Sequence, residues 1–245
     1  MRALVTRPRE DAEGVAELLR QRGVEVQVEP LLEIVPILGA TVDLNGVQAL
    51  LVTSANGVRA LAAATTERAL PVLAVGEASA RKAREAGFGD VVSAEGDVDS
   101  LAALVRRRLS PDQGALLHAA ASQVAGDLAG QLGEAGFTVR RVVLYEARPA
   151  PEPSPALVAA LRDKAIDLAL FFSPRTAATF ANLIGGASLG EACRAIDAYC
   201  LSAAVARGLA PLRWRNVRVA ARPEMEALMA LVDEDLTRAK DRQRG

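Results

Sequence analysis

Short apolar runs alternate with amphipathic stretches along nearly the whole chain. We interpret the apolar runs as strands, at 3–5, 24–28, 49–53, 72–75, 91–92, 115–118, 138–142, 167–172, 198–201 and 217–220. The stretches between them predict helices. The clearest, at 9–22, places its apolar residues on one face and ends at Gly23, as a left-handed cap requires. This alternation predicts an α/β fold in which parallel sheets are flanked by helices.

The pattern occurs twice. The strand, serine and helix of 43–63 return at 165–184, and 3–34 matches 115–147. Halves of about 110 to 130 residues are the size of single small domains. We therefore expect two similar lobes, which together would form a cleft for a large ligand. Ser154-Pro155 and Ser173-Pro174 each place a capping serine before a proline at the first helical position.

Two segments interrupt the alternation, at 30–37 and 143–153. They occupy equivalent repeat positions and carry prolines, so each is better interpreted as a linker or an edge strand than as a core strand. Two linkers suggest that the chain crosses twice between the lobes, which would exchange the N-terminal units. Two lobes that follow each other along the chain, without any exchange, fit the repeat equally well.

Composition and charge narrow the class of protein. The chain has 245 residues with 51% hydrophobic content, enough for two cores, and only the charged segment 236–245 predicts a frayed tail. No apolar stretch is long enough to cross a membrane, and Arg7 and Arg9 lie where a signal peptide would be apolar. We expect a cytoplasmic protein that does not bind membranes.

A net charge of −1 and 3% aromatic residues argue against nucleic acid as a partner. All but three of the 29 basic residues are arginine, which suits carboxylates, although a biased Ala-rich and Arg-rich composition explains this as well. Cys193 and Cys200 have neither redox nor metal-binding spacing, so we expect buried structural thiols and no metal.

Several motifs together resemble the uroporphyrinogen-III synthase family. They are VTRP at 5–8, LLVTSANGVRAL at 50–61, LAVGEASARKAREAGF at 73–88, VLYEA at 143–147, FFSPRTAATF at 171–180 and CLSAAVARGL at 200–209. The match runs in order along essentially the full chain. It implies two α/β lobes joined by a two-stranded linker with exchanged N-terminal units: one lobe of 1–36 plus 150–245, and one of 37–149.

The resemblance also implies an activity. Enzymes of this family close hydroxymethylbilane, a linear tetrapyrrole with acetate and propionate arms, with inversion of the last ring through a spiro intermediate. Water leaves and no cofactor is needed. The enzyme must hold a flexible polyanion, assist the departure of hydroxide and control the geometry of ring closure. We expect a monomer whose only partner is this small-molecule substrate.

Candidate site residues follow from the fold and from the resemblance. In open parallel sheets, ligands bind beyond the carboxyl ends of the strands, where helix N-termini present free N–H groups. The candidates for binding the carboxylate arms at such positions are Arg7, Ser54, Asn56, Ser79, Ser173 and Ser202. Helix capping alone is the competing interpretation for Ser54, Asn56 and Ser173, and a first-turn serine without contact to substrate for Ser79.

Tyr145 is the candidate catalytic residue, because the resemblance maps an implicated tyrosine onto it. A phenol with a pKa near 10 is protonated at neutral pH and can donate a proton to leaving hydroxide. Aromatic packing over the linker is the competing interpretation. The only histidine, His118, ends a predicted strand, where we expect a core or rim role.

The chain departs from the family pattern in two places. Ala119, Ala120 and Ala121 stand where relatives often show glycine with basic residues, and Ala203, Ala204 and Val205 where many carry threonine. These departures favour one alternative, a non-catalytic two-lobed module that binds an acidic small molecule. The near-complete coverage and Tyr145 favour the enzyme. A dinucleotide site is not expected, because no G-x-G-x-x-G follows the first strand.

Overall fold

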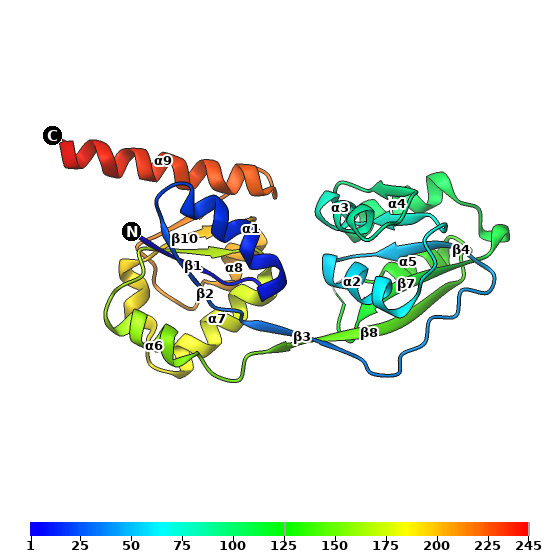
Figure 1. The fold of residues 1–245 in the computed structure, drawn as a ribbon, viewed down its shortest axis with the longest axis horizontal. Helices are drawn as coiled ribbons and strands as arrows, with labels where there is room; N and C mark the ends of the chain where they lie inside the picture. Colours follow the sequence, from blue (N-terminus) through cyan, green and yellow to red (C-terminus); the bar gives the residue numbers. More distant parts are fainter. Residues whose placement is uncertain (125, 245) are drawn as a thin grey trace. The chain divides into compact units, whose positions relative to one another are not determined.

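The computed structural model describes residues 1–124 and 126–244 (Figure 1). The chain divides into two compact units, Met1–Glu33 with the chain from Pro149 onward, and Ile34–Arg148. The first boundary lies within strand β3 (Leu32–Pro36) and the second at the end of strand β8 (Val139–Pro149). The chain therefore passes from one unit to the other twice.

The first unit is built on a parallel sheet with the strand order β11-β10-β9-β1-β2. The strands are β1 (Arg2–Val5), β2 (Glu25–Val28), β9 (Leu168–Phe171), β10 (Asp197–Cys200) and β11 (Asn216–Val219). Because β1 pairs with β9, the N-terminal strand-helix-strand segment lies in the same sheet as the C-terminal strands.

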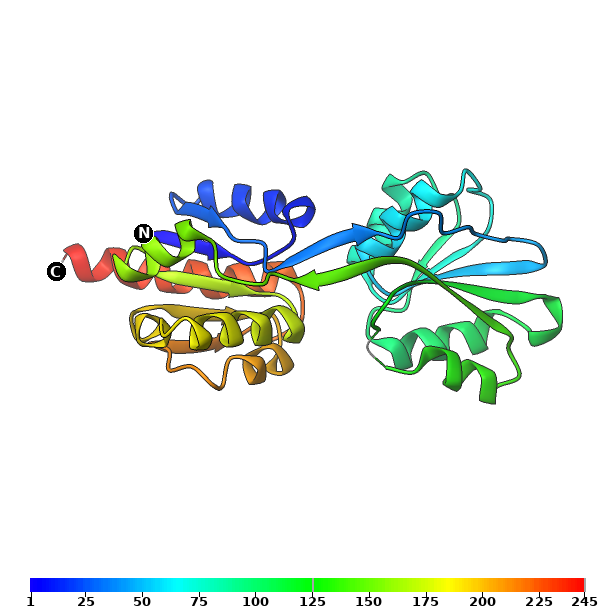
Figure 2. The ribbon, with the colours of Figure 1, turned by 90° about the horizontal axis from the view of Figure 1, so that it is seen from below.

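Helices cover both faces of this sheet, as Figure 2 shows for α1 and α7. Helices α1 (Arg9–Arg20) and α9 (Met225–Arg244) pack on one face, and α6 (Pro155–Arg162), α7 (Pro174–Gly186), α8 (Ala203–Gly208) and the 3₁₀ helix η2 (Gly190–Ala195) on the other. Successive residues of β1 alternate between them: Leu4 contacts the α7 side, and Ala3 and Val5 the α1 side. A strand buried on both faces must be apolar throughout, which explains the short continuous runs.

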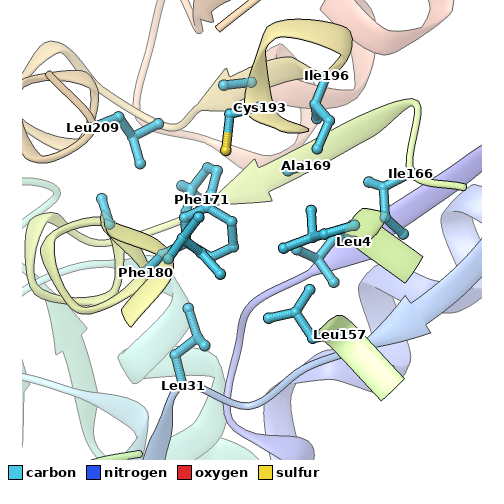
Figure 3. Close-up of a cluster of buried hydrophobic side chains, with 14 of the residues drawn as sticks. Leu4, Leu31, Leu157, Ile166, Ala169, Phe171, Phe180, Cys193, Ile196 and Leu209 are labelled. Carbon is cyan, nitrogen blue, oxygen red and sulfur yellow. The ribbon is translucent and has the colours of Figure 1, made fainter. Parts of the chain in front are cut away.

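The core on the α7 side contains the two cysteines, and Figure 3 shows Cys193 among apolar side chains. The rings of Phe171 and Phe180 pack edge to face there with centroids 5.2 Å apart. Burial raises the pKa of both thiols to about 12, so Cys193 and Cys200 are neutral packing groups, as expected. Within residues 1–124 and 126–244, no three His, Cys, Asp or Glu side chains gather as a metal site.

The second unit is built on a sheet with the strand order β3-β8-β7-β4-β5-β6. Its other strands are β4 (Val47–Val52), β5 (Val72–Ala74), β6 (Val91–Ser93) and β7 (Ala115–Ala121). Helices α2 (Ala55–Ala64) and α3 (Glu77–Glu85) pack on one face, α4 (Val98–Arg108) and α5 (Leu128–Glu134) on the other, and the 3₁₀ helix η1 (Pro111–Gln113) precedes β7. In the part of the chain that the structure describes, no helix is long and apolar enough to cross a bilayer.

Strand β3 is one of the two edge strands of this sheet, in agreement with one interpretation of 30–37. Ile37 N donates to Leu144 O at 2.9 Å and Ala150 N to Leu31 O at 2.9 Å, so β3 and β8 run antiparallel. The sequence predicted a strand at 138–142 followed by a linker or an edge strand at 143–153. Instead, β8 continues to Pro149 and lies between β3 and β7, inside the sheet. The prolines of this segment stand only at the strand end and beyond it, so they do not interrupt the pairing.

The predicted helix ends are confirmed at three places. Gly23 has φ +75°, and Val24 N donates back to Leu19 O at 3.1 Å, which closes the end of α1. Ser154 and Ser173 cap α6 and α7 through the N–H groups of Leu157 and Thr176, each at 3.1 Å. Ser154 Oγ also donates to the buried carboxylate of Glu29 at 2.6 Å, which fastens the end of β2 to α6.

The prediction of a frayed tail at 236–245 is wrong for 236–244, which belong to α9. No glycine or proline interrupts α9, and Arg238 pairs with Asp235 one turn away at 3.3 Å. Arg22, just after α1, holds Asp233 of α9 by two hydrogen bonds of 2.6 and 2.9 Å. Local helix propensity and this anchor outweigh the polar composition of the segment.

His118 lies inside β7 rather than at its end, because the strand continues through Ala119–Ala121. The residue is 3% exposed, and its Nε2 lies 3.4 Å from Thr53 Oγ1. Burial, together with the charge of Arg141, lowers the pKa of His118 from 6.5 to about 4. His118 is therefore a neutral core residue at pH 7, which agrees with the expected core role.

We expect this histidine to weaken the fold in mild acid. Between pH 6.5 and 4 the unfolded chain binds a proton at His118 that the folded chain does not, so the free energy of unfolding falls as pH falls through this window. The loss should approach about 3 kcal/mol by pH 4, at 1.36 kcal/mol per pKa unit. Urea unfolding of the wild type and His118→Gln at several pH values measures it. The free energy of unfolding of the variant should lack this part of the pH dependence. If it falls with pH in parallel with that of the wild type, the prediction is contradicted.

Candidate active site

The second unit has one position at which its strand order reverses. From β4 the chain passes through α2 to β5, and from β7 through α5 to β8 on the opposite side. The carboxyl ends of β4 and β7 therefore flank a topological switch point, where open parallel sheets bind ligands. Thr53 and Ser54 follow β4 at this point.

Ser54 begins helix α2. Its backbone is extended, with φ −160° and ψ 158°, and its Oγ accepts a hydrogen bond from Gly57 N at 2.9 Å. The first turn of α2 lies directly against β7, because a Cβ atom at Gly57 would stand 3.0 Å from Ala119 O. A glycine in the helix and a small residue in the strand thus allow the helix N-terminus to approach the switch point.

Tyr145 reaches the same point through a register shift in β8. Ala120 pairs with Val143 and Ala121 with Tyr145, so Leu144 has no partner on β7. Without this extra residue Leu144 would stand opposite Ala121. The shift brings Tyr145 onto the face that carries Ala119 and Ala121, which packs against α2. Irregularities of this kind are frequent beside active sites because they redirect a side chain.

The Tyr145 hydroxyl lies 2.7 Å from Ser54 Oγ. The residue is only 6% exposed, and its ring packs in the apolar cluster beneath α2. The sequence suggested either a proton donor or an aromatic ring packed over a linker. In the structure the ring packs in the core of the second unit, and its hydroxyl takes part in a polar contact at the helix N-terminus.

The other candidates of this unit are held differently. Asn56 Oδ1 accepts a hydrogen bond from Arg59 one turn later, which orients the amide within α2. Ser79 is the third residue of α3 and is 5% exposed, so little of it is accessible to a ligand. Gly76 precedes α3 and offers no side-chain cap.

The first unit has its own switch point, between β1 and β9. Arg7 follows β1, and Ser173 follows β9. The Arg7 guanidinium carbon lies 4.9 Å from the ring centre of Phe172, and Arg7 Nη2 lies 3.8 Å from Asp11 Oδ2. Arg7 is thus a half-buried cation, held over the loop from which α7 begins.

Ser173 and Ser202 both cap helices. Ser173 Oγ accepts from Thr176 N at 3.1 Å and pairs with Thr176 Oγ1 at 2.7 Å. Ser202 Oγ accepts from Val205 N at 3.4 Å, at the start of the short helix α8. The departure at Ala203–Val205 therefore lies in the first turn of α8, where main-chain N–H groups are presented whatever the side chains are.

Two polar groups at the switch points were not among the candidates. Thr53 contacts His118, and Thr6 Oγ1 donates to Leu170 O at 2.8 Å, so a threonine precedes the loop at each point. The signal available in the sequence was a threonine directly before each candidate, Thr53 before Ser54 and Thr6 before Arg7.

Arg141 donates hydrogen bonds to Ala121 O and Ser122 O at 2.7 and 2.8 Å, which fixes the chain after β7. No pattern in the sequence singled out Arg141, because it is an exposed arginine within a strand.

At each switch point, taken by itself, side-chain hydrogen-bond donors lie beside a helix N-terminus. The first offers a guanidinium beside the N-terminus of α7, which suits carboxylate groups. The second offers a phenol and a serine hydroxyl in contact, which can bind an anionic group or donate a proton to a leaving oxygen. An open hollow lined by Arg2, Arg20 and Gly23 lies at the amino ends of β1 and β2, at the edge opposite these groups.

Comparison with known proteins connects these features to one family. The family model of uroporphyrinogen-III synthase HemD matches residues 13–230. Uroporphyrinogen-III synthetase from Helicobacter pylori has a similar structure, with a TM-score of 0.65 and 18% identity over 96% of this chain and 99% of that chain. A mutant uroporphyrinogen III synthase from the extremely thermophilic bacterium Thermus thermophilus has a TM-score of 0.56 and 20% identity over 98% and 99%.

No curated protein sequence gives a significant match. At these identities the solved structures establish the fold, and the family model, which covers most of the chain, establishes the family. The chain belongs to the uroporphyrinogen-III synthase family, the cyclising lyases of tetrapyrrole biosynthesis.

Proposed function

We propose that the protein closes hydroxymethylbilane to uroporphyrinogen III, with inversion of the last pyrrole ring and loss of one water. The family match over residues 13–230 carries this proposal. The structure supports it with the phenol of Tyr145 in contact with Ser54, and with helix N-termini at the carboxyl ends of parallel strands. The hydroxide that leaves needs a proton, and the carboxylate arms need cations and N–H donors.

The substrate's carboxylate arms are bound by both units in this proposal. Arg7 and the first turns of α7 and α8, behind Ser173 and Ser202, take arms at the first unit. Asn56 and the first turns of α2 and α3 take arms at the second, with Ser79 contributing mainly its helix turn because it is buried. Charge-assisted hydrogen bonds to carboxylates contribute about 1.5–3 kcal/mol each. Several such contacts would hold a flexible chain in the conformation that closes.

Tyr145 is the proton source in this proposal. Its hydroxyl lies at the start of α2, where the helix N-terminus favours the negative charge left on the phenol after proton transfer. A well-placed acid accelerates the departure of hydroxide by about 10²-fold or more.

We propose that the two units are the exchanged lobes that the resemblance implies, of 1–36 plus 150–245 and of 37–149. The pairing of β1 with β9 and the unit boundaries at 33/34 and 148/149 support this. We further propose a monomer that works in the cytoplasm. The free, buried thiols of Cys193 and Cys200 fit a reducing compartment, and the proposed groups all belong to one chain.

The isomer ratio tests the function directly. Freshly generated hydroxymethylbilane closes unassisted to the symmetric type I product, so we expect predominantly type III in the presence of the folded protein. Chromatography of the oxidised products measures the ratio, with heat-unfolded protein as the control. Only type I product from protein with intact circular dichroism would instead favour the non-catalytic binding module.

Tyr145→Phe should slow type III formation by about 10²-fold while the protein stays folded, because only the acidic hydroxyl is lost. The chain's second tyrosine is a matched control. The Tyr199 hydroxyl donates to Asp235 Oδ2 at 2.7 Å in the first unit, and Asp235 keeps Arg218 as a partner after Tyr199→Phe. This control should lose about 1 kcal/mol of stability and retain its turnover. Equal turnover in Tyr145→Phe and wild type would remove Tyr145 from the reaction.

Arg7→Ala should raise KM about tenfold or more, because a carboxylate arm loses a charge-assisted contact. Arg2 is the matched control: it lies at the amino end of β1 and pairs with Glu25 at 3.0 Å. Steady-state kinetics should show an unchanged KM for Arg2→Ala. A similar small change in both variants would mean that general charge, and not Arg7 itself, attracts the substrate.

A further inference from the structure

Ser54 has a defined set of hydrogen bonds. A serine hydroxyl has one proton to donate and two lone pairs that accept. One lone pair is taken by Gly57 N at 2.9 Å, which fixes the oxygen at the start of α2. The contact of 2.7 Å with the Tyr145 hydroxyl takes either the second lone pair or the proton.

The two residues differ in their access to a ligand. Tyr145 is 6% exposed and its ring belongs to the apolar cluster of the second unit. Ser54 is partly exposed, and it stands at the carboxyl end of β4, on the edge of the sheet where ligands bind. A substrate at this edge therefore has more access to Ser54 than to Tyr145.

We infer that Ser54 is the group that touches the leaving hydroxyl of the substrate and that it relays the proton of Tyr145. Ser54 Oγ then accepts from both Gly57 N and the phenol, and its own proton points toward the ligand. This deepens the proposed function and rests on it. It replaces the role of Ser54 as a contact for a carboxylate arm with a part in the chemical step.

The relay balances in protons and charge. The bond between the terminal carbon and its hydroxyl oxygen breaks, and the oxygen keeps the electron pair. It takes the Ser54 proton to become water, while Ser54 Oγ takes the phenolic proton, so that the negative charge is on Tyr145. Because the overall reaction releases only water, the substrate gives up one proton as the ring closes, and that proton restores the phenol. The nearby positive end of α2 stabilises the transient phenolate.

Ser173 is a matched serine for comparison, because it is the repeat equivalent of Ser54 and its recorded partners belong to its own helix. Ser173 occupies the equivalent position in the first unit and caps α7 through Thr176 N at 3.1 Å. Its second partner is Thr176 Oγ1 in the same helix, at 2.7 Å, and not a phenol. Capping is therefore common to both serines, whereas contact with a tyrosine distinguishes Ser54.

A double-mutant cycle tests the relay. Ser54→Ala, Tyr145→Phe and the double variant are assayed for kcat and for the fraction of type III product from fresh hydroxymethylbilane. We expect each single change to lower kcat by about 10²-fold, and the double variant to stay within about twofold of the slower single variant. Ser54→Thr should keep most of the activity, since threonine retains both hydroxyl and cap. A second cycle with Ser173→Ala and Tyr145→Phe should be additive.

Ser54→Asn separates the relay from helix stability. Asparagine caps helices as well as serine does, but its amide cannot accept one proton and pass on another. We expect this variant to fold like the wild type and to be as slow as Ser54→Ala, which also guards against the case in which Ser54→Ala fails to fold. Thermal unfolding reports the fold, and a kcat close to wild type in Ser54→Asn would overturn the relay.

The outcomes separate the inference from the proposed function. Wild-type kcat in Tyr145→Phe would refute the acid role of the tyrosine, and the relay with it. Two results would refute the relay alone and leave Tyr145 as the acid. One is a slow Tyr145→Phe together with wild-type kcat in Ser54→Ala. The other is a double variant whose loss of kcat equals the product of the two single losses.

Discussion

Parallel strand pairing is the constraint on which the rest of this structure depends. Strands that run in one direction need crossover connections, and the carboxyl ends of these parallel strands then lie on one edge of the sheet. The pairing of β1 with β9 and of β7 with β4 also determines where the strand order reverses. The two polar groupings, Arg7 beside α7 and Tyr145 beside α2, both lie at such reversals. The sheet order thus positions chemistry that the individual residues would not indicate.

The two reversals are repeat equivalents with different partners. Both have a serine cap, and both have a threonine just before the loop. The second differs because a register shift in β8 adds a phenol, and because Gly57 lets α2 approach the backbone of β7 to within contact. Duplication thus gave two similar helix N-termini, and small local changes brought a phenol into contact with one of them.

Local signals in the sequence were sufficient for much of the fold. The positions of ten strands, the end of α1 at Gly23 and the serine caps of α6 and α7 depend on nearest neighbours, and they were predicted correctly, although β7 and β8 extend beyond the predicted runs. Features that depend on distant partners were not. The full length of β8 requires β3 beside it, α9 requires Arg22 to hold Asp233, and the direction of Tyr145 requires one unpaired residue on its strand. The contact of Ser54 with Tyr145 joins residues 91 positions apart, so no local pattern could show it.

The pairing of β1 with β9 has a consequence for the order of events during synthesis. Arg2 N donates a hydrogen bond to Asp167 across 165 positions, and every strand of the second sheet, from β3 to β8, is translated between them. At about 5 to 20 residues per second, the first strand waits roughly ten seconds or longer on the ribosome for its partner. The second unit can fold in that interval, whereas the N-terminal segment must stay soluble with its apolar face uncovered. Nascent-chain folding of this protein therefore starts in the middle of the sequence and ends by joining its two ends.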